Sequence, residues 1–393
     1  MRKSILRKIT NKDNQKLIFC TILLFLFPIV LMPYLIYKVV SEENKKRRCI
    51  FLAFFCCTMG FLAYHTVPLE SDDLSRHYEN MRILQYTNIV DSFQSSYPLV
   101  YLNTIIMYIC AKLGKYQLYP MIYITIGYGL ILYIYTKMLE KKKISKFEKI
   151  IIFLFVFFAV NCRDFISGLR NYFSFIVCMY LIVREKVFNY KKIYTYIGIL
   201  CVSFIHTSAI AFLVWEFISD TFKKGTLKKI ILVSIFFTLP VLFLVSKGMI
   251  PFVPQTIINK LDMYINSAKV INFNVYFYQI GIVLLMVFCH IINRRQNMMK
   301  FTEINNFLDY YLVFMLSIIP IMTFLSRFVS FLVAISPVIF VQTYLQIDKN
   351  KKWRTGFTGV LICFSLAGIL MLLASVRAYP WNFDLDNILI WWL

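Results

Sequence analysis

The stretch IIIFLFVFFAVNCRDFISGLRNYFSFIVCMYLIV, residues 150–183, decides the fold of this chain. Two apolar runs flank a short polar segment that holds two arginines, an aspartate and two asparagines. Apolar runs of about 20 residues cross a bilayer as helices, and charged residues beside them belong at the surface or in an enclosed cavity. The stretch therefore predicts two membrane helices, over 150–162 and 165–183, with a polar break between them.

The rest of the chain has the same apolar character. Of its 393 residues, 59% are hydrophobic, and the mean hydropathy is +0.66. Soluble domains average about 45–50% apolar residues, and the runs lack the alternation of barrel strands. We expect an all-α integral membrane protein, a single polytopic domain over 1–393 with about 12 transmembrane helices, within a range of about 10–13. The expected spans are 17–40, 49–66, 118–137, 150–162, 165–183, 193–205, 207–220, 230–246, 274–293, 306–324, 328–347 and 356–376.

The net charge of +23 does not indicate nucleic-acid binding, because Lys and Arg lie in short loops between the spans. Such loops face the cytoplasm under the positive-inside rule, and they also attract anionic lipid head groups. The basic loops are 45–48, 137–149, 184–192, 222–229, 294–300 and 348–354.

Keeping these loops on one side of the membrane predicts the topology. Segment 97–114 must then lie along the outer surface as a juxtamembrane helix. Segments 193–205 and 207–220 must be two short helices that turn at His206. Residues 67–117 become an extracytoplasmic loop with juxtamembrane helices, and residues 247–273 become a second extracytoplasmic loop.

The N-terminal tail conflicts with this topology. Its basic residues, Arg2, Lys3, Arg7 and Lys8, fall on the outer side of the membrane, where the positive-inside rule does not expect them. Either segment 17–40 turns back on itself near its two prolines, or the rule is broken there.

No motif indicates a cofactor. The ten Cys include no CxxC pair, most of them lie in apolar runs, and the chain has no P-loop, GxGxxG or HExxH motif. We expect no cofactor and no protein metal site, and we leave the use of a divalent metal open.

The sequence SDDLSRHY, residues 71–78, places two carboxylates directly after a predicted span. Ser71 is a candidate N-cap, with Asp72 and Asp73 in the first helical turn. At four-residue spacing, Asp72 faces Arg76, and Asp73 faces His77. These residues form either a salt-bridged surface helix or a general base oriented by its neighbours.

The polar segment NCRDFISGLRNYF, residues 161–173, predicts an anion site. On one helix, Arg163, Ser167 and Arg170 share a face, and Asp164, Gly168 and Asn171 form the adjacent stripe. Arginines at membrane depth usually serve a function, and guanidinium groups suit diphosphate oxygens. The alternative is an Arg163–Asp164 arrangement that holds helices together.

Three further segments contain candidate site residues. His206, in FIHTSAIAF, is either a buried structural histidine or a cavity residue that contacts phosphate or sugar. Arg327 lies between two predicted spans and either binds an anion or extends to the interface. We expect His65 and His290 to be structural. The tail 378–393 is either an interfacial aromatic segment or a saccharide contact.

In order and spacing, these motifs resemble the EpsG family of bacterial exopolysaccharide proteins, grouped with Wzy-type polymerases. The resemblance rests on SDDLSRHY, on R-D-x-x-S-G-x-R-N from Arg163 to Asn171, on I-H-x-S from Ile205 to Ser208, and on Arg327. Residues 68–137 also resemble the opening of GT-C glycosyltransferases, with an acidic outer loop followed by a juxtamembrane helix.

The resemblance implies a polysaccharide polymerase in the bacterial cytoplasmic membrane. Such an enzyme joins oligosaccharide repeat units carried on undecaprenyl diphosphate at the outer face, during synthesis of capsule, exopolysaccharide or O-antigen. Asp73 or Asp72 would be the base, and Arg163, Arg170 and Arg327 would bind diphosphate, with His206, Arg76, His77 and Asn171 as further substrate contacts. A flippase and a chain-length regulator are candidate partners. The alternative functions are a lipid-linked oligosaccharide flippase and a membrane O-acyltransferase.

Overall fold

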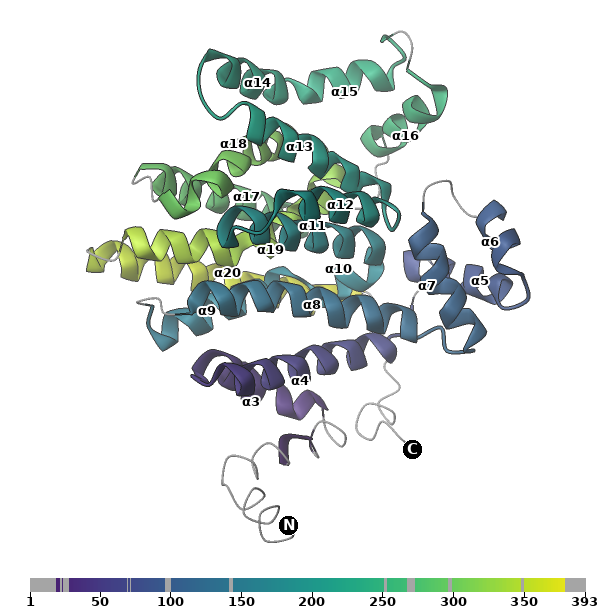
Figure 1. The fold of residues 1–393 in the computed structure, drawn as a ribbon, viewed down its shortest axis with the longest axis horizontal. Coiled ribbons are helices and arrows are strands. Elements are labelled where there is room, and N and C mark those ends of the chain that lie inside the picture. The colour runs from purple at the N-terminus through teal and green to yellow at the C-terminus, as the bar shows by residue number, and fades with distance from the viewer. Residues whose placement is uncertain are drawn as a thin grey trace.

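The computed structural model describes residues 19–21, 23, 28–68, 70, 72–95, 100–140, 144–250, 253–266, 273–295, 299–347 and 350–378. Every element formed by these residues is a helix (Figure 1). The helices are α3 (Pro28–Ser41), α4 (Lys45–Tyr64), α5 (Asp73–Leu84), α6 (Ile89–Ser95), α7 (Tyr101–Lys112), α8 (Leu118–Leu139), α9 (Lys146–Ala159), α10 (Cys162–Ser167), α11 (Leu169–Phe188), α12 (Lys192–Ser203), η1 (Thr207–Ala209), α13 (Ile210–Thr221), α14 (Thr226–Phe236), α15 (Thr238–Ser246), α16 (Gln255–Asn266), α17 (Phe273–Arg295), η2 (Met299–Phe301), α18 (Thr302–Ser317), α19 (Met322–Gln346) and α20 (Lys351–Ala378).

The chain is a multi-pass, all-α membrane protein, as its composition predicts. Among the described residues, five helices are long and apolar enough to span a bilayer: α4, α8, α17, α19 and, over Lys351–Ala374, α20. Helices α14 and α15, which meet at an angle of 47°, form either a sixth, broken span or a re-entrant loop. Shorter helices occupy several other expected spans, so the total of about 12 and the likeness to GT-C enzymes stay predictions.

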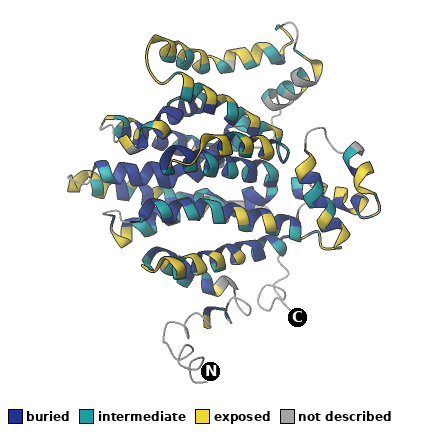
Figure 2. Ribbon diagram, in the orientation of Figure 1, coloured by how far each residue is buried: buried dark blue, intermediate teal, exposed yellow. Residues whose placement is uncertain are grey.

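Helix α19 is the centre of the bundle. Of its most apolar 18-residue window, 83% is buried, against 28% for α20. It packs against α8, α9, α11, α17 and α18, and Figure 2 shows buried residues concentrated in these middle helices. On α20, Leu366, Leu370 and Leu373 are exposed, as expected for a helix that faces lipid.

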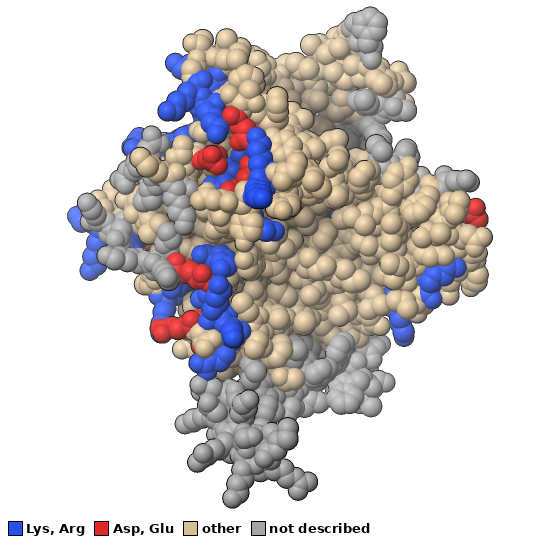
Figure 3. All heavy atoms as spheres, in the orientation of Figure 1, with Lys and Arg blue, Asp and Glu red and all other residues tan. Residues whose placement is uncertain are grey.

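Ion pairs gather at one end of the bundle, where the basic loops meet. Arg48 pairs with Glu140 (2.7 Å), and Arg354 pairs with Glu148 (2.5 Å). These pairs connect three loops that are distant in sequence. Figure 3 shows Lys, Arg, Asp and Glu gathered at the left of the view, beside a broad surface of other residues.

Two further clusters at this end are centred on single charged groups. Asp309 of α18 contacts Lys228, His290 and Arg294. The buried ammonium of Lys186 lies 2.5 Å from Glu216 Oε1 and 2.8 Å from Asp220 Oδ1. The loops 45–48, 137–149, 184–192, 222–229, 294–300 and 348–354 each lie next to one of these ion-paired groups.

The predicted outer loop 67–117 forms the short helices α5, α6 and α7 (Figure 1). Helix α7 has 12 residues and is about 18 Å long, too short to cross the hydrocarbon core. It packs against α5, α6 and the beginning of α8. This length fits the expected juxtamembrane helix.

The predicted break near His206 is present in the structure. Helix α12 ends at Ser203, the chain turns through His206, and α13 begins at Ile210. The second predicted outer loop, 247–273, contains α16. The N-terminal tail and the aromatic tail from residue 379 onward lie outside the described residues.

We predict that Gly60→Ala destabilises the contact between α4 and α8. A Cβ at this position would overlap Thr125 Oγ1 and lie 3.3 Å from the carbonyl oxygen of Met121. Overpacking of this kind costs about 1–3 kcal/mol, so the thermal denaturation midpoint of the detergent-purified protein should fall. Gly129→Ala is the control, because its Cβ would lie 3.8 Å from Cys56 Sγ, an ordinary contact. Equal midpoints for the two variants would contradict the prediction.

Candidate active site

The polar segment of residues 161–168 forms a short helix of its own. Helix α9 ends at Ala159, and the carbonyl oxygen of Val160 accepts a hydrogen bond from Tyr128 Oη (2.7 Å). Asn161 then caps α10, because its Oδ1 accepts from the backbone N–H of Arg163 (3.0 Å). The helix breaks again at Gly168 before α11 begins.

The break at Gly168 separates the two arginines that the sequence assigns to one helical face. That assignment is wrong, because Arg163 lies on α10 and Arg170 lies on α11. Arg163 Nη2 lies 3.4 Å from both carboxylate oxygens of Asp72, just before α5. Arg163 therefore connects α10 to the start of the outer helical unit, which consists of α5, α6 and α7.

The pairing predicted within SDDLSRHY is also wrong. Asp72 is the residue before α5, and its side chain makes no capping hydrogen bond; Ser71 lies outside the described residues. Asp73 pairs with Arg76, three residues on. His77 is buried, with its ring 5.4 Å from that of Tyr119. The spacing of four residues predicted neither contact.

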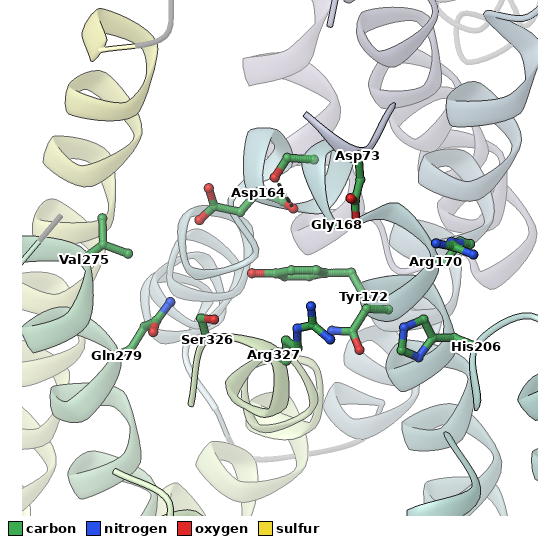
Figure 4. A pocket seen from close by; sticks show the side chains of 12 residues that line it. Asp73, Asp164, Gly168, Arg170, Tyr172, His206, Val275, Gln279, Ser326 and Arg327 are labelled. Atoms are coloured by element: carbon green, nitrogen blue, oxygen red, sulfur yellow. Dashed lines mark hydrogen bonds between the residues drawn. The ribbon is translucent and has the colours of Figure 1, made fainter. Parts of the chain in front are cut away.

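A cavity of about 290 Å³ lies beside this break (Figure 4). Residues of α5, α10, α11, α17 and α19 and the turn before η1 surround it. Five of the predicted site residues line it, namely Asp73, Arg170, Asn171, His206 and Arg327. The other four, Asp72, Arg76, His77 and Arg163, are not among its lining residues. The remaining lining residues are Asp164, Ser167, Gly168, Tyr172, Val275, Gln279 and Ser326.

Two arginines from different helices face this cavity. Arg170 lies in the first turn of α11, and no carboxylate among the described residues pairs with it. Arg327 lies in the second turn of α19 and not between two spans as predicted, because α18 ends earlier, at Ser317. Guanidinium groups that converge on one cavity favour an anion with several oxygens, such as a diphosphate.

His206 and Asn171 add hydrogen-bond donors to the cavity. The backbone N–H of Ser208 donates to His206 Nδ1 (3.4 Å), and Ser208 Oγ lies 2.5 Å from the same nitrogen. Burial, together with the positive charges of Arg170 and Arg327, lowers the pKa of His206 to about 3. The ring is therefore neutral at pH 7, and its proton is on Nε2. The buried Nδ2 of Asn171 has no hydrogen-bond partner among the described residues.

Asp164 also lines the cavity. The sequence places it in a polar stripe beside the arginine face, or in contact with Arg163, and assigns it no role in binding or catalysis. Burial raises the pKa of Asp164 to about 6, against the opposing charge of Arg163 and with a smaller contribution from Asp72. Within the described part of the chain, no side chain hydrogen bonds or pairs with its carboxylate. Gln279 was missed as well, although a glutamine inside the apolar run 274–293 was a usable signal.

Comparison with known families identifies the family of the chain. The sequence model of the EpsG family matches residues 75–383, which is most of the chain. The chain belongs to the EpsG family. Neither the curated proteins nor the solved structures include a match to it. The segment matched in this EpsG-family protein contains Asp164, Arg170, His206 and Arg327, and it begins just after Asp73.

We predict that the Asp72–Arg163 pair stabilises this EpsG-family fold. Arg163 and Asp72 side chains are 10% and 18% exposed, and removing one partner of a mostly buried pair leaves an uncompensated charge that costs about 3–5 kcal/mol. Arg163→Gln should lower the thermal denaturation midpoint, and adding Asp72→Asn should recover part of the loss.

Arg76→Gln provides the control for this pair. The Arg76 and Asp73 side chains are 66% and 39% exposed, and pairs at such positions contribute only about 0–1 kcal/mol. A midpoint for Arg163→Gln as high as that for Arg76→Gln would show that the Asp72 contact does not stabilise the fold.

We predict that His206 keeps one neutral form, with Nε2 protonated, between pH 5 and pH 8. With a pKa of about 3, the ring gains its second proton only well below this range. Ring ¹⁵N chemical shifts of histidine-labelled protein would measure this, with His206→Gln to assign the signal among four histidines. A signal that titrates near pH 6.5 would be inconsistent with this environment.

Proposed function

We propose that this protein is a polysaccharide polymerase of the membrane. It joins oligosaccharide repeat units carried on undecaprenyl diphosphate at the outer face of the cytoplasmic membrane. The observation that carries the proposal is the single cavity in which Arg170 and Arg327 converge with the carboxylates of Asp73 and Asp164. Membership of the EpsG family supports the polymerase class.

The proposed reaction needs a base for the acceptor hydroxyl and positively charged or hydrogen-bonding groups for the leaving diphosphate, and the cavity contains both. A hydroxyl of the acceptor repeat unit attacks the anomeric carbon of the donor glycan, and the lipid diphosphate leaves. Arg170 and Arg327, with the Nε2–H of His206 and the amide of Asn171, stabilise the negative charge on the departing diphosphate. A cavity carboxylate accepts the proton of the acceptor hydroxyl. Arg163 and Asp72, which contact each other, support the site from outside the cavity.

The position of the cavity supports reaction at the outer face. Helix α11 begins at the cavity with Arg170 and ends near the ion-paired Lys186. Helix α19 likewise runs from Arg327 toward the basic end, where α18 carries Asp309. If the basic end is cytoplasmic, the cavity opens toward the opposite leaflet, which is where a translocated lipid-linked repeat unit would be available.

We predict that Arg170→Gln and Arg327→Gln each lower polymer formation by about 10²–10³-fold, because each removes a donor from the leaving diphosphate. The assay uses purified protein in nanodiscs with a lipid-diphosphate-linked repeat unit and no other protein, and it measures glycan length. Arg184→Gln is the matched control, because Arg184 lies on the same helix as Arg170 but stacks on the Tyr190 ring, 4.0 Å from its centroid.

Either of two results would refute the polymerase assignment. One is wild-type protein that forms no glycan longer than the supplied repeat unit. The other is polymer of normal length and rate from both cavity variants. In sealed vesicles that contain the purified protein, transport of the lipid-linked unit across the membrane without elongation would indicate the flippase alternative instead.

A further inference from the structure

We propose that Asp164, rather than Asp72 or Asp73, is the carboxylate that removes the proton from the acceptor hydroxyl. This assignment rests on the proposed polymerase function and names the catalytic base of the same cavity. It also differs from the expectation drawn from the sequence, where only the two aspartates of SDDLSRHY are candidates for the base.

The first argument is the availability of each carboxylate. A general base must place a free oxygen within hydrogen-bond reach of the hydroxyl that it deprotonates. Both oxygens of Asp72 lie 3.4 Å from the Arg163 guanidinium, and Asp72 does not line the cavity. Asp73 lines the cavity, but its Oδ1 contacts Arg76.

Asp164 meets the requirement with both of its carboxylate oxygens, whereas Asp73 has one of its two oxygens in contact with Arg76. Figure 4 shows its carboxylate extending into the cavity from α10, on the opposite side of the Tyr172 ring from Arg327. None of the described side chains hydrogen bonds or pairs with it. Its oxygens are therefore available to a substrate hydroxyl.

The second argument is the electrostatic environment of Asp164. The groups that act on it or respond to its charge are Arg163 and Cys162 of α10, Asp72 before α5, Tyr128 of α8 and Tyr172 of α11. Burial is the largest influence and raises the pKa of the carboxyl to about 6. A base with a pKa near the working pH combines a large ionised fraction with useful basicity.

The proposed step is an attack of the acceptor hydroxyl on the anomeric carbon of the donor. The O–H bond of the acceptor breaks, and its proton moves to a carboxylate oxygen of Asp164. The acceptor oxygen forms a bond to the anomeric carbon, and the bond from that carbon to the diphosphate oxygen breaks. The electron pair of that bond leaves with the lipid diphosphate, whose negative charge Arg170 and Arg327 stabilise.

The test compares Asp164→Asn with Asp73→Asn in the nanodisc assay with a lipid-diphosphate-linked repeat unit. We expect Asp164→Asn to lower kcat by about 10²–10⁴-fold, the usual contribution of a general base, with little change in KM. Asp73→Asn should lower kcat at least tenfold less than Asp164→Asn does. Asp91→Asn is the control for unchanged activity, because Asp91 is exposed on α6 and does not line the cavity. The asparagine is isosteric and removes a buried charge, so the denaturation midpoint of Asp164→Asn should not fall below that of the wild type.

The wild-type pH profile gives a second measurement that does not depend on any variant. Because Asp164 acts as a base, kcat/KM should fall about tenfold per pH unit below pH 6. Retained activity in Asp164→Asn, or a wild-type profile that is flat from pH 7 to pH 4.5, would overturn the assignment while leaving the polymerase function in place. Wild-type protein that forms no polymer at any pH would overturn the function, and the assignment with it.

Discussion

A helix that breaks inside a packed bundle must satisfy its free backbone groups without bulk water. In this protein that constraint applies at residues 160–168, and the rest of the site depends on how it is met. The hydroxyl of Tyr128 donates to the carbonyl of Val160, and the amide oxygen of Asn161 accepts from the next turn. With these groups satisfied, α10 is a separate short helix with an orientation of its own.

The orientation of α10 determines which charged groups contact each other. In one continuous helix, Arg163 and Arg170 would lie on the same face. Because α10 is separate, Arg163 instead reaches Asp72 of the outer helical unit, and Asp164 faces the cavity. The Arg163–Asp72 contact, which holds the start of α5, and the exposure of the Asp164 carboxylate to the cavity therefore both follow from the separate direction of α10.

Much of the fold, and the side on which the site residues gather, could be predicted from the sequence. Apolar length indicates helices, and the basic loops require Asp73, Arg170, His206 and Arg327 to share one side of the membrane. The structure places these four around one cavity. That prediction needed only to know whether an odd or an even number of membrane crossings separates two segments. Errors of a few residues in the ends of the helices do not change that number.

Side-chain directions could not be predicted in the same way, because they change with every residue at which a helix starts or stops. Arg327 illustrates this. Pro320 ends α18 early, since proline cannot donate a backbone hydrogen bond and disfavours helix before it, and α19 starts at Met322. Arg327 is therefore a helical residue that faces the cavity. Asp164 was missed for the same reason, since the start of α10 at Cys162 and its end at Ser167 determine which of its side chains faces the cavity.

The two ends of the bundle use the same residue types in opposite ways. At the basic end, Glu148 accepts two hydrogen bonds from one arginine, and Asp309 contacts three basic side chains. At the cavity end, Arg170 and Asp164 have no such partner among the described residues. Leaving charged groups unpaired in a partly buried cavity costs stability. That cost is offset when a ligand that carries both an anion and a hydroxyl binds there, because binding to the folded state alone stabilises it. The contrast between the two ends therefore distinguishes the charges that hold the bundle together from those that are available to a substrate.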